Sequence, residues 1–307
     1  MIALLAPGQG SQTPGMLTPW LELDGVESRL AAWSERTDLD LVRLGTTADA
    51  EEIKDTAVTQ PLVVALSLIA AEALQQRVQV PAGTPVAGHS VGELAAAALA
   101  GALTPDDAVA LAAVRGREMA AACALEPTGM AAVLGGDPDA VVAHLTESGL
   151  DPANRNGAGQ IVAAGRQPAL TQLAEEPPAG TRVRPLPVAG AFHTRFMAPA
   201  QEMLAKHAES VGATDATLPL LSNADGAEVT AAPDIVRRLV EQVTKPVRWD
   251  SCMSALGERG VRTAVELPPA GTLSGLVRKE LKGVRTIPLK TPDDLDQVAD
   301  AIGSQGD

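Results

Sequence analysis

Residues 88–93, Gly-His-Ser-Val-Gly-Glu, have types and spacing suited to covalent catalysis. They contain G-x-S-x-G between an apolar stretch that predicts a strand and an Ala/Leu-rich stretch that predicts a helix, the context of a nucleophile elbow. The two glycines would allow a sharp turn that exposes Ser90, and the following helix would direct free N–H groups at the same point. Because the motif is short, a glycine-rich turn with an incidental serine is the competing interpretation.

A serine needs a general base to become a nucleophile, and His193 is the candidate. It lies 103 residues after Ser90, in Ala-Gly-Ala-Phe-His-Thr, at an expected loop–helix junction. Its alternative role is that of a capping or packing histidine. His144 and His207 fall in predicted amphipathic helices as surface or structural residues, and His89 is expected to pack beneath the elbow.

Two further groups could stabilise negative charge near Ser90. The backbone N–H of Val91 and an amide of the loop at residues 8–12, Gly-Gln-Gly-Ser-Gln, are candidate oxyanion donors. The same loop could bind phosphate, although it has neither GxGxxG nor a GK[ST] ending. Arg115 follows the apolar stretch 108–114, so it is either a pocket charge or a snorkelling surface residue; without further information the surface position is favoured.

Composition excludes several classes of protein. The 307 residues are 46% hydrophobic and suggest about two domains or subdomains, whereas a net charge of −14 disfavours binding to nucleic acid or an anionic membrane. Two cysteines without CxxC fit a reduced compartment, and four histidines without HExxH predict no metal site. The start of the chain lacks a signal peptide, and the longest apolar runs are shorter than a membrane span, so we expect a soluble, cytoplasmic protein.

Alternating strands and helices predict a mostly parallel sheet with helices on both faces. The helix at 60–77 would carry Pro61 in its first turn, and Thr104 would cap the helix that follows 91–103 and ends near residue 122. Further helices are expected at 197–210, 233–243, 249–259, after residue 271 and at the end of the chain. The strands of this sheet are expected at 2–6, 85–88, 218–222, 263–267 and 285–289.

Residues 125–188 have a different character and predict an inserted subdomain. Strands at 130–134, 151–156, 160–164 and 181–188 and helices at 137–148 and 168–175 follow the βαββαβ order of a ferredoxin-like unit. Asn156-Gly157 is expected to form the turn between its second and third strands. Residues 1–124 and 189–307 would then form one discontinuous catalytic subdomain.

Six short motifs occur in one order over nearly the whole chain: GQGSQ, GHSVGE, RGREM, GAFHT, PVRW and ELPPAGTL. In this order they resemble the malonyl-CoA:acyl carrier protein transacylases of type II fatty acid synthesis, and the acyltransferase domains of polyketide synthases. The resemblance implies an α/β-hydrolase-like large subdomain and a ferredoxin-like small one.

The resemblance also implies a ping-pong reaction. Ser90 would attack the thioester of malonyl-CoA with His193 as base, and the phosphopantetheine thiol of acyl carrier protein would then take the malonyl group. His193 would be oriented by the backbone carbonyl of Gln242 rather than by a carboxylate. The backbone N–H groups of Gln9 and Val91 would form the oxyanion hole.

Substrate-binding residues follow from the same resemblance. Arg115 would hold the malonyl carboxylate bidentately, and the ring of Phe192 would disfavour an α-methyl group. Asn154 and Asn156 would form a polar edge of the pocket. Gln60 would line it, with a helix cap as the alternative. Val91 stands where many relatives carry leucine, a change that leaves the backbone donor in place.

The implied partners are malonyl-CoA, which is a substrate, and an acidic, phosphopantetheinylated acyl carrier protein; no permanent cofactor is expected and the chain is expected to be a monomer. A local basic face would have to offset the charge of −14. Its candidates, or else a scatter of ordinary surface charges, are Arg182, Arg184, Arg195, Lys245 and Arg248. Three alternatives remain: a discrete acyltransferase of a polyketide synthase, a serine thioesterase or hydrolase, and a non-catalytic scaffold.

Overall fold

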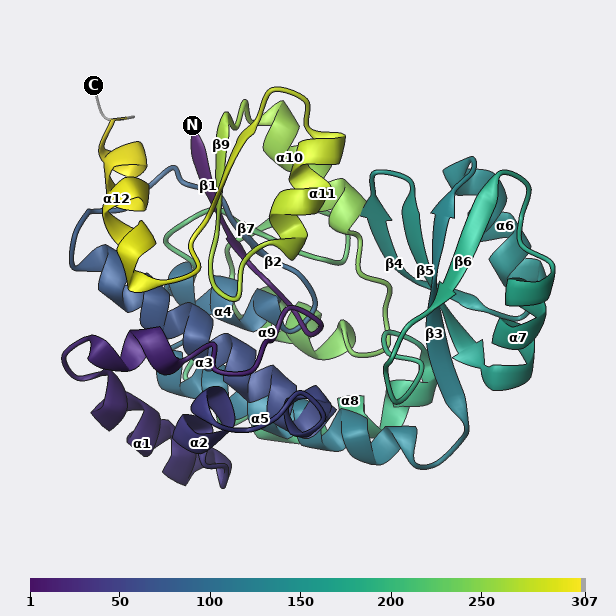
Figure 1. Ribbon diagram of the computed structural model, residues 1–307, viewed down its shortest axis with the longest axis horizontal. Helices are drawn as coiled ribbons and strands as arrows, with labels where there is room; N and C mark the ends of the chain where they lie inside the picture. The colour runs from purple at the N-terminus through teal and green to yellow at the C-terminus, as the bar shows by residue number, and fades with distance from the viewer. Residues whose placement is uncertain (305–307) are drawn as a thin grey trace.

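Two β-sheets organise the chain, and the computed structural model describes residues 1–304 (Figure 1). Neighbouring strands of the larger sheet are parallel, except that β8 runs antiparallel to β7. The predicted mixed α/β fold is confirmed, although the short strand β8 was not predicted. In spatial order this sheet contains β10 (Arg285–Pro288), β9 (Thr263–Glu266), β1 (Ile2–Ala6), β2 (Val86–Gly88), β7 (Leu220–Leu221) and β8 (Glu228–Val229).

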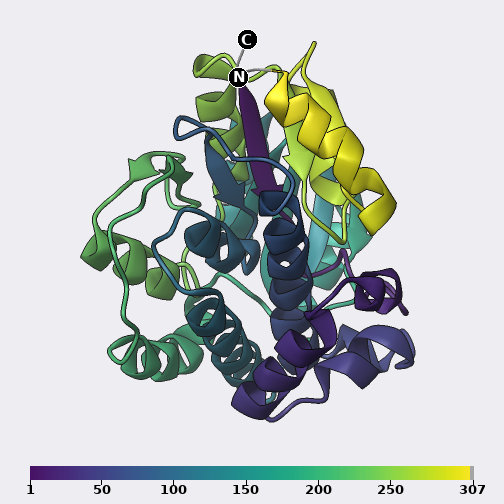
Figure 2. The same ribbon diagram turned by 90° about the vertical axis from the view of Figure 1, so that its left-hand side faces the viewer.

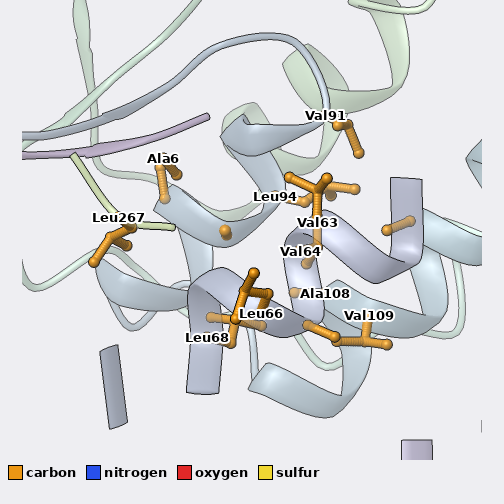
Figure 3. Packing of buried hydrophobic residues seen from close by; sticks show 14 of the residues in the cluster. Ala6, Val63, Val64, Leu66, Leu68, Val91, Leu94, Ala108, Val109 and Leu267 are labelled. Atoms are coloured by element: carbon orange, nitrogen blue, oxygen red, sulfur yellow. The ribbon is translucent and has the colours of Figure 1, made fainter. Parts of the chain in front are cut away.

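The core lies on both faces of the larger sheet. Every residue of β1 is buried, which explains why this strand reads as a continuous apolar run. Ile2, Leu4 and Ala6 join the cluster that includes Val63 and Val109, and Figure 3 shows the packing around Ala6. Ala3 and Leu5 point the other way and pack with α10 (Trp249–Glu258) and α11 (Thr272–Glu280).

Helix α3 (Thr56–Gln75) forms the centre of the first of these faces. The Asp55 side chain accepts the N–H of Ala57 at 2.8 Å and starts the helix four residues earlier than predicted, so Pro61 lies in the second turn and not in the first. Although its apolar run is short, α3 is the one helix within residues 1–304 with the length and composition to cross a bilayer. However, 83% of its apolar window is buried inside the protein, as expected of a core helix.

The remaining helices of the large body surround this core (Figure 2). Thr104 caps α5 as predicted, accepting the N–H of Asp107 at 3.1 Å, whereas α4 ends four residues before the predicted end of its helix. The helices near the N-terminus were not predicted, because Gly25 and the segment 38–40 interrupt their pattern. These unpredicted helices are α1 (Val26–Thr37) and α2 (Leu41–Thr46). The other helices around the core are α4 (Gly92–Leu99), α5 (Pro105–Cys123), α8 (Ala198–Ala208), α9 (Ala232–Glu241) and α12 (Leu295–Gly303).

The second sheet is antiparallel and confirms the βαββαβ order. Its helices cover one face, through contacts of Ala131 and Ile161 with Leu145 and Leu173, whereas Val162 faces the main core. The loop between the second and third strands is Ala158-Gly159, so the turn predicted at Asn156-Gly157 is wrong by two residues. The elements are β3 (Thr128–Gly135), α6 (Pro138–Glu147), β4 (Asp151–Gly157), β5 (Gln160–Arg166), α7 (Gln167–Glu175) and β6 (Thr181–Pro185). The division at residues 125–188 stays a prediction.

Edge strand β4 joins the small sheet to the large body. The N–H of Val247 donates to the carbonyl of Ala153, and the N–H of Arg155 donates to the carbonyl of Val247, both at 2.9 Å. The segment after α9 is thereby held against the small sheet. This contact holds the segment that contains Gln242 between the small sheet and the part of the chain built on the large sheet.

Candidate active site

Ser90 lies at a sharp turn between β2 and α4, with a left-handed φ of +54°. Only glycine fits on either side of the turn: a Cβ at Gly88 would lie 2.0 Å from the carbonyl oxygen of Gly92, and one at Gly92 would lie 2.4 Å from that of Ala6. The N–H of Ser90 donates to Asn223 Oδ1 at 2.8 Å, which fixes the strained backbone. The turn presents the hydroxyl as a nucleophile elbow does.

The structure places His193 and Gln242 beside this hydroxyl. Ser90 Oγ and His193 Nε2 are 2.8 Å apart, and His193 Nδ1 lies 2.7 Å from the backbone carbonyl oxygen of Gln242. A carbonyl can only accept, so Nδ1 carries the proton and Nε2 is free to take the proton of Ser90. A carbonyl here occupies the place of the carboxylate in the Ser-His-Asp arrangement.

The protein surroundings keep His193 neutral. Burial, with a further contribution from the charge of Arg115, lowers the pKa of His193 to about 3. A neutral imidazole is the form that can accept a proton. The base is therefore available at any pH above this value.

We expect the pH profile of Ser90 acylation by p-nitrophenyl acetate to lack an acid limb near pH 6.5, the usual pKa of histidine. Because the pKa of His193 is lowered to about 3, its proton-accepting form persists as pH falls from 8 towards 5 and is lost only below that range. Burst rates of nitrophenol release over this range measure it, with His193→Ala as the background. A half-loss of rate near pH 6.5 would contradict the burial of the base.

Arg115 is buried on α5, with 2% of its surface exposed, so the surface position favoured from the local sequence is wrong. Its Nη1 donates to Gln60 Oε1 at 2.7 Å, and its Nη2 donates to Gln242 Oε1 at 2.8 Å and to Ser90 Oγ at 3.3 Å. Close packing of α5 on α3 makes this possible, since a Cβ at Gly116 would lie 2.6 Å from the carbonyl oxygen of Thr56. Burial lowers the pKa of Arg115 to about 10, which still leaves it charged at neutral pH.

Gln60 is the fifth residue of α3 and 1% exposed, so it does not cap the helix. Its side-chain oxygen, Oε1, accepts from Arg115, and its Nε2 lies 3.5 Å from Met119 Sδ. Gln60 also lines the pocket in front of Ser90. The structure thus places it where the resemblance implied.

Sequence reasoning missed two buried residues of the site, Glu93 and Asn223. Asn223 accepts from the N–H of Ser90 and donates through Nδ2 to the carbonyl of Gly88 at 2.8 Å. Its own N–H donates to Glu93 Oε1 at 3.0 Å. An acidic residue in the otherwise apolar helix α4 was a usable signal for Glu93, whereas the Ser-Asn-Ala-Asp-Gly sequence around Asn223 only suggests a turn.

A pocket between the carboxyl edge of the large sheet and the small sheet opens onto Ser90 and His193. Gln9, Phe192 and the two asparagines of β4, Asn154 and Asn156, line it. Asn156 Oδ1 lies 2.9 Å from His89 Nε2, so β4 contacts the residue that precedes the nucleophile. His89 was expected beneath the elbow; its ring lies edge-on to the ring of Trp249, and the residue lines the pocket.

The two candidate oxyanion donors are in different surroundings. The Gln9 side chain turns away and donates to Thr56 Oγ1 at 3.1 Å, so its backbone N–H is the group that can serve the pocket. Val91 immediately precedes α4, where helical N–H groups lack partners within the helix. Within residues 1–304 the backbone N–H groups of Gln9 and Val91 donate no hydrogen bond. Both N–H groups therefore remain available to an oxyanion.

Known proteins match this chain over almost its entire length. The profile of the acyl transferase domain matches residues 4–299. A malonyl CoA-acyl carrier protein transacylase of Mycobacterium tuberculosis is 60% identical over 301 residues, which cover 97% of this chain and 99% of that protein.

Solved structures show the same fold. The crystal structure of MCAT from Mycobacterium tuberculosis has a TM-score of 0.94 and 59% identity, over 97% of this chain and 99% of that one. A type II PKS acyl carrier protein in complex with its malonyl-transacylase gives a TM-score of 0.91 at 28% identity, over 98% of this chain and 99% of that chain. All residues that line the pocket lie inside the segment 4–299 that the family profile matches.

Proposed function

The chain belongs to the acyl transferase family, and we infer that its pocket transfers a malonyl group from malonyl-CoA to acyl carrier protein. The observation that carries the mechanism is a buried arginine beside an activated serine: Arg115 Nη2 is 3.3 Å from Ser90 Oγ, which is itself 2.8 Å from His193. This reaction supplies malonyl units for fatty acid synthesis.

In the first half-reaction His193 Nε2 takes the Ser90 proton as Oγ attacks the thioester carbonyl carbon. The N–H groups of Gln9 and Val91 stabilise the resulting oxyanion. The C–S bond then breaks, His193 returns its proton to the CoA thiolate, and the malonyl ester of Ser90 remains. The carbonyl of Gln242 accepts from Nδ1 throughout and stabilises the imidazolium.

In the second half-reaction the phosphopantetheine thiol of the carrier protein attacks the ester. His193 takes the thiol proton, the C–O bond to Ser90 breaks, and the proton returns to Oγ. Throughout, Arg115 pairs with the free carboxylate of the malonyl group. To do so its Nη2 exchanges the contact with Ser90 Oγ for the substrate.

Phe192 bears on the choice of acyl group. It is 6% exposed and lines the pocket next to His193. A ring in this place crowds a substituent on the α-carbon, so methylmalonyl is the poorer substrate. The preference is modest, because one methyl group in an apolar pocket contributes only about 1–3 kcal/mol.

The competing enzyme class is a serine hydrolase, which forms the same ester but releases it to water. Beside Ser90 lies a buried cation, Arg115, that an ordinary esterase does not need. The test is product analysis after mixing with malonyl-CoA, with and without phosphopantetheinylated carrier protein. We expect malonyl-carrier protein to dominate when the carrier is present and free malonate to form slowly without it; equal malonate release in both reactions would favour the hydrolase.

A carrier protein of polyketide synthesis is the alternative acceptor to that of fatty acid synthesis, since one structural relative is bound to a type II PKS carrier protein. Parallel transfer assays with a carrier of each kind decide this. For the chain itself we propose a cytoplasmic enzyme that acts as a monomer without a permanent cofactor. All groups of the proposed mechanism come from one chain.

For the acidic carrier we propose a docking face with fewer basic residues than the five candidates from the sequence. Arg248 forms two hydrogen bonds with Asp250, at 2.9 and 3.0 Å, and Arg195 lies over the ring of Phe196 at 4.8 Å. Arg182 and Arg184 are exposed on β6 and form no ion pair within the described residues. They point away from the α6–α7 side, towards which Val183 packs, and β6 leads directly to pocket residues Leu186 and Val188.

Reversal of both charges, Arg182→Glu with Arg184→Glu, should raise the KM for carrier protein about tenfold at low salt. Malonylation of Ser90 by malonyl-CoA should stay within about twofold, because the chemistry lies deeper in the pocket. Steady-state transfer against carrier concentration measures the effect. The matched control reverses Arg262 and Arg285, exposed at the opposite, amino ends of β9 and β10; equal KM values for the two double variants would eliminate this face.

A further inference from the structure

A buried carboxylate that the mechanism does not use lies behind Ser90. Glu93 is in the first turn of α4 and 3% exposed. Its Oε1 accepts the N–H of Asn223 at 3.0 Å, and its Oε2 accepts Nε2 of Gln242. Burial raises the pKa of Glu93 to about 7, and these two hydrogen bonds oppose the rise, so the charged form depends on its donors.

The amide of Gln242 fits this cluster in one orientation. Its Nε2 faces three acceptors, Glu93 Oε2, the carbonyl of Ser90 at 3.1 Å and Asn223 Oδ1 at 3.2 Å. Its Oε1 accepts Nη2 of Arg115 at 2.8 Å. Rotation of the amide by 180° would place its N–H groups against a guanidinium donor and its oxygen against a carboxylate, leaving buried groups unsatisfied on both sides.

Gln242 therefore contacts two functional groups through different atoms. Its backbone carbonyl accepts from His193, and its side chain holds Arg115, whose Nη2 is also within 3.3 Å of Ser90 Oγ. Loss of the amide orientation leaves the backbone contact in place and removes an acceptor from Arg115. A change at Glu93 should consequently alter the position of Arg115 more than that of the base, His193.

We propose that Glu93 is a positioning residue for malonyl selectivity: its carboxylate orients the Gln242 amide, whose oxygen holds Arg115 beside Ser90 ready for the substrate carboxylate. This inference rests on the proposed function, in which Arg115 binds the malonyl group. It predicts that a change at Glu93 affects malonyl and acetyl substrates differently.

Glu93→Gln keeps the shape and replaces one acceptor oxygen with an NH2 group. Whichever way the new amide turns, a donor then faces either the N–H of Asn223 or Gln242 Nε2. We expect kcat/KM for Ser90 malonylation to fall about tenfold, mostly through KM, while acetylation by acetyl-CoA stays within about twofold. In an Arg115→Ala background the same change should leave the malonyl-to-acetyl ratio unaltered, because a residue that acts through Arg115 has no further effect without it.

Two controls separate positioning from general destabilisation. Glu266 is another fully buried glutamate, which accepts three backbone N–H groups at the start of α11 and does not contact Arg115 or Gln242; Glu266→Gln should lower Tm without moving the malonyl-to-acetyl ratio. The rate at which a neutral sulfonyl fluoride modifies Ser90 should be unchanged in Glu93→Gln, which shows that the elbow and His193 are intact.

The inference is overturned if Glu93→Gln keeps the wild-type ratio, if it lowers malonylation and acetylation equally, or if its effect on the ratio persists in the Arg115→Ala background. These outcomes differ from failure of the proposed function. Should Arg115→Ala alone retain the malonyl preference, the role of Arg115 fails without reference to any Glu93 variant.

Discussion

Ser90→Ala should abolish the covalent adduct that the wild-type protein forms with malonyl-CoA. The alanine retains the backbone N–H that Asn223 accepts, so the turn persists while the only atom that can carry the ester is lost. We expect intact-protein mass spectrometry after brief incubation to show one malonyl group on the wild type and none on the variant. Transfer to carrier protein should fall by at least about 10³-fold, since one member of the Ser90–His193 unit is gone.

Two comparisons make this result specific. Ser254→Ala removes an exposed serine hydroxyl from α10, which bonds only to Glu258 in the described structure, and should leave the adduct unchanged. Incubation of the wild type with acetyl-CoA and methylmalonyl-CoA reports selectivity in the same experiment. An adduct that survives Ser90→Ala would refute the covalent mechanism and return the non-catalytic scaffold or another nucleophile to consideration.

Arg115→Ala should remove the preference for malonyl over acetyl groups. In the proposed mechanism the buried guanidinium gives paired donors to the malonyl carboxylate, whereas an acetyl group offers it no charged partner. Breaking such a buried pair costs on the order of 3–5 kcal/mol, so the malonyl-to-acetyl ratio of kcat/KM should fall at least about a hundredfold. Single-turnover acylation with each CoA thioester measures the ratio.

The same helix supplies the control for this change. Arg117 is exposed two residues further along α5 and bonds to Glu118, so Arg117→Ala should leave the ratio unchanged. Arg115→Lys keeps the charge but loses the bidentate geometry, so its malonyl-to-acetyl ratio should lie between those of the wild type and Arg115→Ala. Since the alanine variant leaves Gln60 Oε1 without its donor, its Tm should also be measured. A wild-type ratio in a folded Arg115→Ala protein would show that another group selects the malonyl chain.

Local pattern was sufficient for much of the fold. The strand–turn–helix around Ser90 follows from glycines at 88 and 92, where any side chain would collide with backbone. The βαββαβ order was readable because most of its elements show a hydrophobic pattern of their own, and Asp137 also caps α6. Two predicted boundaries were wrong. Asp55 caps α3 and starts it before Pro61, and pairing of β4 with β5 places their turn two residues beyond Asn156.

The site depended on contacts that no local pattern contains. The segment around Arg115 favoured a surface position by itself, and that prediction is wrong, because an arginine after an apolar run suits either place. Packing of α5 on α3 decided it.

By itself, the sequence determined the nucleophile turn, the two kinds of sheet and the motifs that carry the family resemblance, because these depend on residues close together in the chain. The tertiary structure alone decided that Arg115, Gln242, Glu93 and Asn223 form one buried hydrogen-bonded cluster. Its contacts join residues 127 and 130 positions apart. The physical reason is that burial makes each polar group depend on a partner, and only the packing of distant segments determines which partner that is.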